Sequence, residues 1–270
     1  MALSVNTNVG AMIALQNLNK TTGLLEQTQL RVTTGLKVNS PKDDASTFAI
    51  AQTLRGEIAG VKAVKGALAN GESIVNVAIS GGMAIADLLT EMKAKVVQAN
   101  QEGLDTQSRT ALHNDFTSLR AQLETIVATA EFNSTNLISS GASNLTVLST
   151  VDGSTIAVNA QNLSATGLGI QSSDISTSSA AVTALTSIET AITRVTERLA
   201  NLGSAAKRIE IQNEFSSQLV DILKQGVGNL VDAALAEESA TLQALQITQQ
   251  VGVLAWASAN AGPQSILGLF

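Results

Sequence analysis

A seven-residue repeat of apolar side chains runs through most of this chain. Its longest stretch comprises Leu54, Val61, Leu68, Val75, Gly82, Leu89 and Val96. A heptad sustained over so many turns predicts a helix that packs along a supercoiled seam. We expect this helix to begin with Ser40 as its N-cap and Pro41 at its first position, and to run to about Asn100.

Similar stripes before and after this stretch predict further helices. The first comprises Ala11, Leu15, Leu18, Thr22, Leu25, Gln29, Val32 and Leu36, and its helix should end near Gly35. The next comprises Leu112, Phe116, Leu119, Leu123, Ile126 and Ala130. From Leu185 to Leu245 the stripe continues but changes register, which predicts a break or a phase change near Gly226 and Gly228. Gly262-Pro263 should end the last helix.

The middle of the chain differs in composition. It has no Lys or Arg between Arg120 and Arg194, and Ser, Thr, Asn and Gly dominate. Alternating apolar residues flank Asp152-Gly153, which predicts a β-hairpin, whereas residues 172–179 have the composition of a loop. A disordered middle is the competing interpretation. The predicted fold class is mainly α, with long antiparallel coiled-coil helices from both termini and a small β-hairpin region in the middle.

Both ends of the chain lack charge. Nineteen residues precede Lys20, and 32 residues follow Glu238, the last charged residue. A solvated helix normally carries a charged outer face. Gln243, Gln246 and Gln250 interrupt the apolar pattern too often for a membrane span, and no secretory signal is evident at the start. Uncharged helical ends instead favour burial between many copies of one protein.

Composition argues against several classes of function. The net charge is −6 without a basic cluster, which argues against nucleic acid as a partner. Cysteine is absent, which excludes disulfides and thiolate chemistry. His113 is the only histidine, and neither a metal-ligand cluster nor a phosphate-binding loop accompanies it. The sequence therefore predicts no enzyme activity, no metal and no cofactor.

Several runs of residues resemble the signatures of the bacterial flagellins. At the N-terminal end these are residues 5–8, 14–18, 34–45 (TGLKVNSPKDDA), 48–51 and 131–137 (EFNSTNL). At the C-terminal end they are residues 232–239 (DAALAEES), 245–246, 249–250 and 259–260. The resemblance covers roughly residues 2–138 and 180–270. Residues 226–232 (GVGNLVD) are similar to the short flagellins of alphaproteobacteria.

This resemblance implies a structural subunit that self-assembles into the flagellar filament for motility. Residues 1–40 and 229–270 would form an inner terminal coiled-coil domain, the filament core. Residues 41–228 would form an outer helical domain that includes a variable region at 139–179. The subunit would travel unfolded through the filament channel by type III export and be extracellular. Its partners would be further copies, an export chaperone, and hook-junction and cap proteins.

The expected functional residues fall into three groups. The assembly interface comprises Leu15, Leu18, Leu25, Val32, Leu235, Leu242 and Leu245. The connection between the domains comprises Thr34, Gly35, Asn39, Ser40, Asp43 and Asp44. Flagellins often carry O-linked sugars on outer hydroxyls, and the candidate region here includes Ser139, Ser149, Thr150, Ser172, Ser173 and Ser178.

Many flagellins carry an arginine-containing stretch that a vertebrate innate immune receptor recognises. The matching stretch here, residues 89–94 (LTEMKA), has no arginine, so we do not expect that recognition. A hook-filament junction protein is an alternative, because it shares the terminal helices. A surface adhesin or glycan-binding flagellin is another, although no aromatic residue lies between Phe132 and Phe215 to stack on a sugar.

Overall fold

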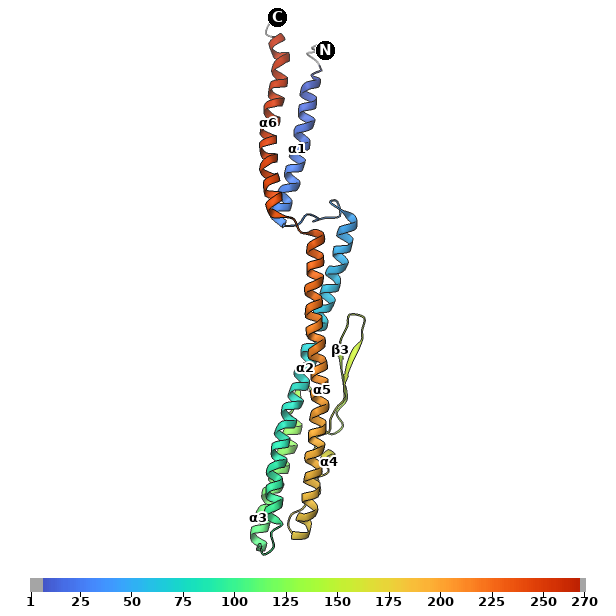
Figure 1. Cartoon of the computed structure of the whole chain (residues 1–270), viewed down its shortest axis with the longest axis vertical. Helices are drawn as coiled ribbons and strands as arrows, with labels where there is room; N and C mark the ends of the chain where they lie inside the picture. Colours follow the sequence, from blue (N-terminus) through green and yellow to red (C-terminus); the bar gives the residue numbers. More distant parts are fainter. Residues whose placement is uncertain (1–6, 268–270) are drawn as a thin grey trace. The chain divides into compact units, whose positions relative to one another are not determined.

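The computed structural model describes residues 7–267, and the side chains of residues 7–261 (Figure 1). The chain divides into two compact units. The terminal unit comprises Met1–Gly56 and Ile222–Phe270, and the middle unit comprises Glu57–Asp221. Long helices from both ends and a small hairpin confirm the predicted fold class.

The terminal unit is built on two antiparallel helices, α1 (Val9–Thr34) and α6 (Leu235–Leu267). They lie side by side, as the sequence predicted (Figure 1). At one end of the pair the Asn8 side chain donates to the carbonyl of Ala259 at 2.7 Å. At the other end Arg31 pairs with Glu238 at 3.2 Å.

The start of α2 (Ala45–Ala99) differs from the prediction. Asp44, not Ser40, caps this helix, because its carboxylate accepts from the amides of Ser46 and Thr47 at 2.9 and 3.0 Å. Ser40 and Pro41 lie in the turn before it, where the amide of Asp43 donates to the carbonyl of Ser40. The prediction missed this because the carboxylate of Asp43 accepts from the amides of Asn39 and Ser40, and this closes a turn before the helix begins. The end of the first helix at Gly35, with φ of 70°, is confirmed.

Near the C-terminus the helices extend further than the glycines predicted. Helix α5 (Ser178–Val231) runs through Gly226 and Gly228 and stops only after Val231. It stops there because main-chain bonds from Lys37 to Val231 and from Ala233 to Gly35 draw the chain out of the helix. Helix α6 also continues past Gly262-Pro263 to Leu267. A proline removes one N–H donor, and this helix tolerates the loss.

The core of the middle unit is the predicted heptad seam. Leu68, Leu89 and Val96 of α2 are fully buried, together with Phe116 and Leu123 of α3 (Thr106–Thr129). Helix α5 contributes Ile188, Val195, Leu202 and Ile209 to the same cluster. Among the described helices α2 alone has the length and apolar composition of a membrane span, and its apolar stripe packs in this core.

Four short strands form two hairpins in the middle unit. β3 (Leu145–Leu148) pairs antiparallel with β4 (Thr155–Val158) around Asp152-Gly153, which confirms the predicted hairpin. The first hairpin, β1 (Glu131–Phe132) with β2 (Thr135–Asn136), was not predicted. Its turn residues Asn133 and Ser134 both have positive φ, and only the asparagine signals such a turn in the sequence.

A short helix and an irregular loop connect the second hairpin to α5. Helix α4 (Ala165–Leu168) is capped by Ser164 and ends at Gly169. Arginines from the long helices hold this connection by its carbonyls: Arg194 donates to Leu168 at 2.9 Å, and Arg198 donates to Gly167 at 3.1 Å and also to Asn162. These bonds order a segment whose composition alone also allowed disorder.

The second hairpin lies against α2 where two glycines leave room. A Cβ atom at Gly71 would lie 2.5 Å from one methyl carbon of the buried Val147, and a Cβ at Gly60 would lie 3.0 Å from Val151. On the α5 side the Gln212 amide donates to the carbonyl of Ser149 at 2.8 Å. The absence of a side chain at Gly71 therefore sets how closely the hairpin approaches the helix.

This contact predicts different effects for two glycine substitutions in α2. Gly71→Ala and Gly66→Ala both gain helix propensity, worth roughly 1 kcal/mol, but only Gly71→Ala overpacks Val147, since the space at Gly66 is open. We expect Gly71→Ala to be less stable than Gly66→Ala by about 1–3 kcal/mol. Urea unfolding of the two monomeric variants measures the difference, and equal midpoints would show that the hairpin does not rest on Gly71.

Candidate assembly surface

The face that α1 turns toward α6 is poor in large apolar residues. Its less exposed positions recur at spacings of three and four, at Ala11, Ala14, Leu18, Thr21, Leu25, Thr28 and Val32. Only Ala11 and Thr28 are fully buried. The predicted stripe shares Ala11, Leu18, Leu25 and Val32 with this face, and its Thr22 is also half-buried. Leu15 and Gln29 are exposed, and Ala14 and Thr28, one residue earlier, take their places on the face.

The face of α6 toward α1 is also poor in large apolar residues. Its less exposed positions are Glu238, Leu242, Leu245, Gln249, Gly252 and Ala259. A Cβ at Gly252 would lie 3.3 Å from a methyl carbon of Leu18, so the helices approach closely there. Leu242 and Leu245 are half-buried, whereas Leu235 is 51% exposed. Five of the seven predicted interface residues thus lie on the less exposed faces of α1 and α6.

A second set of apolar residues points to solvent. Ile247, Val251 and Leu254 are 63%, 58% and 69% exposed and, at spacings of four and three, share one face of α6. Met12, Ile13, Leu24 and Leu30 are exposed on α1. The sequence prediction missed these residues because it followed one apolar stripe per helix. The signal that could have found them is the lack of charge around a second stripe.

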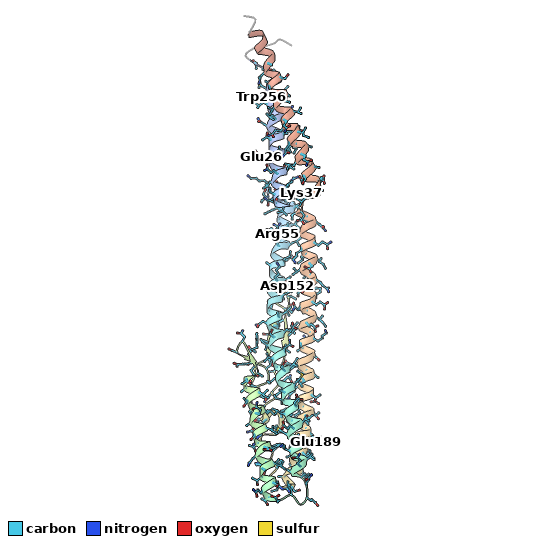
Figure 2. The ribbon with its side chains drawn as sticks, turned by 90° about the vertical axis from the view of Figure 1, so that its left-hand side faces the viewer. Glu26, Lys37, Arg55, Asp152, Glu189 and Trp256 are labelled. Carbon is cyan, nitrogen blue, oxygen red and sulfur yellow. The ribbon has the colours of Figure 1, made fainter. Side chains whose placement is uncertain are left out.

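Uncharged polar groups surround the exposed apolar side chains of α6. On α6 no charged residue follows Glu238, and the side chains of Gln243, Gln246 and Gln250 are exposed. Figure 2 shows Trp256 on the same helix pair as Glu26, nearer the chain ends. An apolar face without flanking charges can be buried against another protein without desolvating ions. This face of α6 could therefore be covered by another protein without burying a charge.

The connection after α1 is an ordered segment. Gly35, Asn39, Ser40, Asp43 and Asp44 come together in consecutive caps and turns. The Asp43 carboxylate accepts from the amides of Asn39 and Ser40 at 3.1 and 2.9 Å, while the hydroxyl of Thr34 donates back to Leu30. A small core of Val38, Ala51 and Val231 lies beside this segment.

Hydrogen bonds lower the pKa of both carboxyls in this connection. For Asp43 the largest cause is the backbone amide of Ser40, and for Asp44 it is the backbone amide of Thr47. Both groups are therefore more stable as carboxylates in the folded chain than in the unfolded chain.

The candidate O-glycosylation residues differ in access. Ser149 is buried and its hydroxyl donates to the carbonyl of Ser154 at 2.9 Å, and the Thr150 hydroxyl accepts from the Ser154 amide. Ser172 is exposed. Ser139, Ser173 and Ser178 are half-buried. Of the six, Ser172 has the most open position for an enzyme that modifies hydroxyls.

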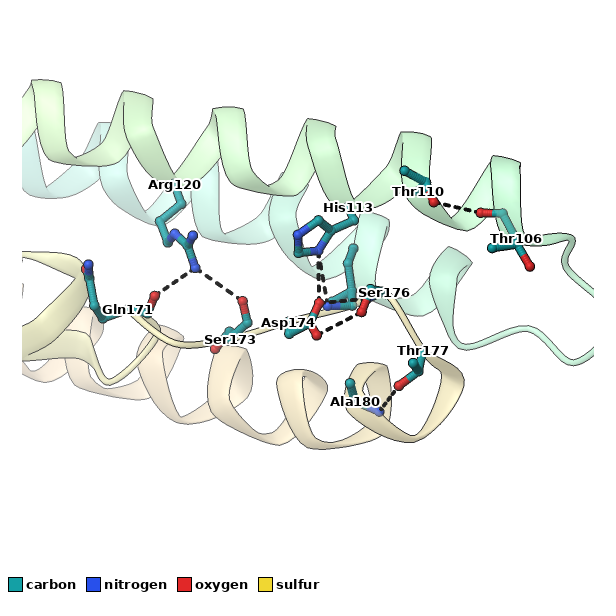
Figure 3. Close-up of polar contacts among 11 residues, drawn as sticks. Thr106, Thr110, His113, Arg120, Gln171, Ser173, Asp174, Ser176, Thr177 and Ala180 are labelled. Carbon is teal, nitrogen blue, oxygen red and sulfur yellow. Dashed lines mark hydrogen bonds and ion pairs between the residues drawn. The ribbon is translucent and has the colours of Figure 1, made fainter.

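The only histidine holds the loop before α5 (Figure 3). His113 Nδ1 lies 3.1 Å from a carboxylate oxygen of Asp174, and Arg120 donates to the carbonyls of Gln171 and Ser173 at 2.8 and 3.2 Å. The amide of Ser176 is the largest cause of a lowered pKa at Asp174, and His113 acts in the same direction. Within the described chain no cluster of His, Cys, Asp and Glu could hold a metal.

Residues 89–94, where the sequence analysis expects no receptor recognition, lie on α2. Leu89 and Met92 are buried in the core of the middle unit, while Thr90 and Glu91 are exposed. Lys93 pairs with Glu189 of α5 at 3.0 Å. The side chains that a receptor could reach here carry no guanidinium, and the absence of recognition stays a prediction.

Comparisons with known proteins cover nearly the whole chain. The model of the bacterial flagellin N-terminal helical region matches residues 5–143, and that of the C-terminal helical region matches residues 185–270. The chain is 44% identical to flagellin FljK of Caulobacter vibrioides over 272 residues, covering 100% of both chains. It is 34% identical to a flagellin of Brucella melitensis over 280 residues, covering 99% of both.

Two solved structures share the fold. A Bacillus cereus flagellin matches 54% of this chain and 86% of its own, with a TM-score of 0.50 and 18% identity. A putative flagellar hook-associated protein from Vibrio parahaemolyticus matches 70% of this chain and 100% of its own, with a TM-score of 0.59 and 15% identity. At these identities the likeness concerns the fold alone.

The lowered pKa of Asp44 predicts an acid-sensitive start of α2. Because the folded pKa lies below the ordinary value of 3.8, the carboxylate stabilises this helix end above that value and the stabilisation is lost as the pH falls through the folded pKa. We expect the NMR amide signals of Ser46 and Thr47 to shift with this titration. In Asp44→Asn, which can still cap the helix, the transition should disappear. An unchanged acid transition in that variant would contradict the assignment.

Proposed function

Because the chain belongs to the bacterial flagellin family, we propose that it is a structural subunit that self-assembles into the flagellar filament for motility. The observation that carries the proposal is the exposed, uncharged apolar face of α6 at Ile247, Val251 and Leu254. Similarity to flagellins along 100% of both chains supports the same role. The work of such a subunit is mechanical, so we propose no enzymatic activity.

We propose that α1 and α6 form the filament core. Their mutual faces bury few large side chains, so a single copy gains little free energy by pairing them. Neighbouring copies would supply the missing contacts for the exposed residues. In this proposal residues 1–40 and 229–270 are the inner domain, residues 41–228 lie outside it, and the connection from Thr34 to Asp44 is where packing between copies is adjusted.

The second part of the proposal concerns export. We propose that the chain passes unfolded through the channel of the growing filament to an extracellular position, with an export chaperone before export and with junction and cap proteins at the filament ends. The exposed glutamines of α6 give this helix a neutral polar surface. Such a surface would hold a passing charged chain only weakly, because it offers no ion pairs.

A hook-filament junction protein is the second candidate. The match to a hook-associated protein along 100% of that chain favours it, but 15% identity speaks only for the fold. Full-length identity of 44% to a flagellin supports the filament subunit instead. A junction protein forms a ring of few copies, so the number of copies per cell separates the two functions.

Electron microscopy of the purified protein tests the proposal. After addition of ammonium sulfate or short filament seeds, we expect long tubes with a central channel. Protein that remains monomeric under seeded conditions would contradict self-assembly, and copies on cells would then be counted.

Because Leu254 lies on the exposed face of α6, we expect a substitution there to weaken assembly without affecting the folding of the monomer. Leu254 is 69% exposed, so Leu254→Gln should leave the thermal unfolding of the monomer unchanged. Burial of a leucine is worth about 1.5–3 kcal/mol, so the critical concentration for assembly should rise by roughly tenfold to a hundredfold.

Gln246→Ala on the same helix provides the matched control, because it changes an exposed polar residue. Sedimentation of polymer at graded protein concentrations gives the critical concentration of each variant. Equal values for Leu254→Gln and the unaltered chain would place Leu254 outside the interface.

A further inference from the structure

A small polar pocket lies between the end of β4 and the middle of α5. It has a volume of about 220 Å³ and is lined by Ala157, Asn159, Gln161, Asn201, Ser204, Ala205 and Arg208. Asn201, Ser204 and Arg208 are spaced by three and four residues, so they share one face of α5. No acidic residue lines the pocket.

Arg208 differs from the other arginines of the middle unit. Arg109, Arg120, Arg194 and Arg198 each donate to backbone carbonyls. Within the described residues, the guanidinium of Arg208 has no hydrogen bond or ion pair, and its neighbour Lys207 is paired with Glu210. Its five donors are therefore available on the wall of a pocket.

Ser204 is a second exception on the same face. Between residues 183 and 217, all Ser and Thr residues of α5 except Ser204 donate their hydroxyls to the carbonyl four residues earlier. Ser204 makes no such bond among the described residues, and the side-chain amides of Asn159 and Asn201 also lack internal partners there. Four exposed polar side chains without a partner inside the described part of the protein, namely Asn159, Asn201, Ser204 and Arg208, thus line one small pocket.

We propose that this pocket binds a carboxylate. A guanidinium can donate two parallel hydrogen bonds to the two oxygens of a carboxylate. Hydroxyl and amide donors can supply further hydrogen bonds to the same oxygens. The pocket carries a single positive charge, which matches a singly charged group better than a phosphate. Its volume suits a group the size of an acidic side chain or a small acid, below the range of typical ligand pockets.

An NMR titration of the monomeric full chain with acetate tests the site. Chloride replaces acetate at constant ionic strength, so that general salt effects cancel. We expect saturable shifts of the side-chain amide signals of Asn159 and Asn201, with a dissociation constant on the order of 1–10 mM for so small a ligand.

Two charge-matched variants decide whether Arg208 is responsible. Arg208→Gln should weaken acetate binding at least tenfold, whereas Arg55→Gln, which removes the same charge outside the pocket, should leave it unchanged. A preserved backbone spectrum in both variants shows that they fold. If acetate binding does not saturate, or if Arg208→Gln binds acetate as tightly as the unaltered chain, the proposal is overturned and Arg208 is a solvated surface residue.

A separate experiment asks which molecule supplies the carboxylate. Only this experiment rests on the proposed function. If an acidic side chain of a second copy occupies the pocket, Arg208→Gln should raise the critical concentration for assembly relative to Arg55→Gln. Equal critical concentrations, with acetate binding established, would assign the site to a free acid or an acidic sugar.

Discussion

The seam between α2, α3 and α5 is the packing on which the middle unit depends. Its buried side chains are mostly Leu, Ile, Val and Ala, with Phe116 as the single aromatic residue. Small side chains bury little area each, so stability comes from repetition along the helices and from close approach. Gly71 and Gly82 serve that approach, since a Cβ at either would lie within 2.7 Å of a neighbouring side chain. The hairpin and the loop before α5 have no comparable core of their own and lie on this seam.

Arginines of the long helices donate hydrogen bonds to the backbone carbonyls of the irregular segment. The segment between Arg120 and Arg194 has no cation of its own, and its irregular backbone leaves carbonyls without partners. Arg120 reaches it from α3, and Arg194 and Arg198 reach it from α5. Each guanidinium donates to main-chain oxygen without an acidic partner in these bonds. These bonds depend little on the sequence of the segment, because a backbone carbonyl is present whatever the side chain is.

Periodicity in the sequence predicted the helices and the seam, because heptads report directly which side is buried. Periodicity failed at helix ends, where individual hydrogen bonds decide which residue begins or ends the helix. Asp44 displaced Ser40 as the cap, and main-chain bonds from residues 35–37 ended α5 at Val231 although its glycines suggested an earlier break. At the candidate surface Leu18, Leu25 and Val32 lie on the α1 face toward α6, whereas Leu15 is exposed and Ala14 lies on that face instead. Their role in assembly stays a prediction. The exposed residues of α6 could not be found by a search for one stripe.

The pairing of α1 with α6 joins the two extremes of the chain. Asn8 contacts Ala259 across a sequence separation of 251 residues, and Arg31 contacts Glu238 across 207. Contacts this distant close only after nearly all of the chain is available, and their closure carries the largest loop entropy. Synthesis begins at the N-terminus, so α1 emerges without its partner and waits until α6 is made. The order of synthesis therefore leaves α1 without its contacts to α6 until the end of the chain has been made.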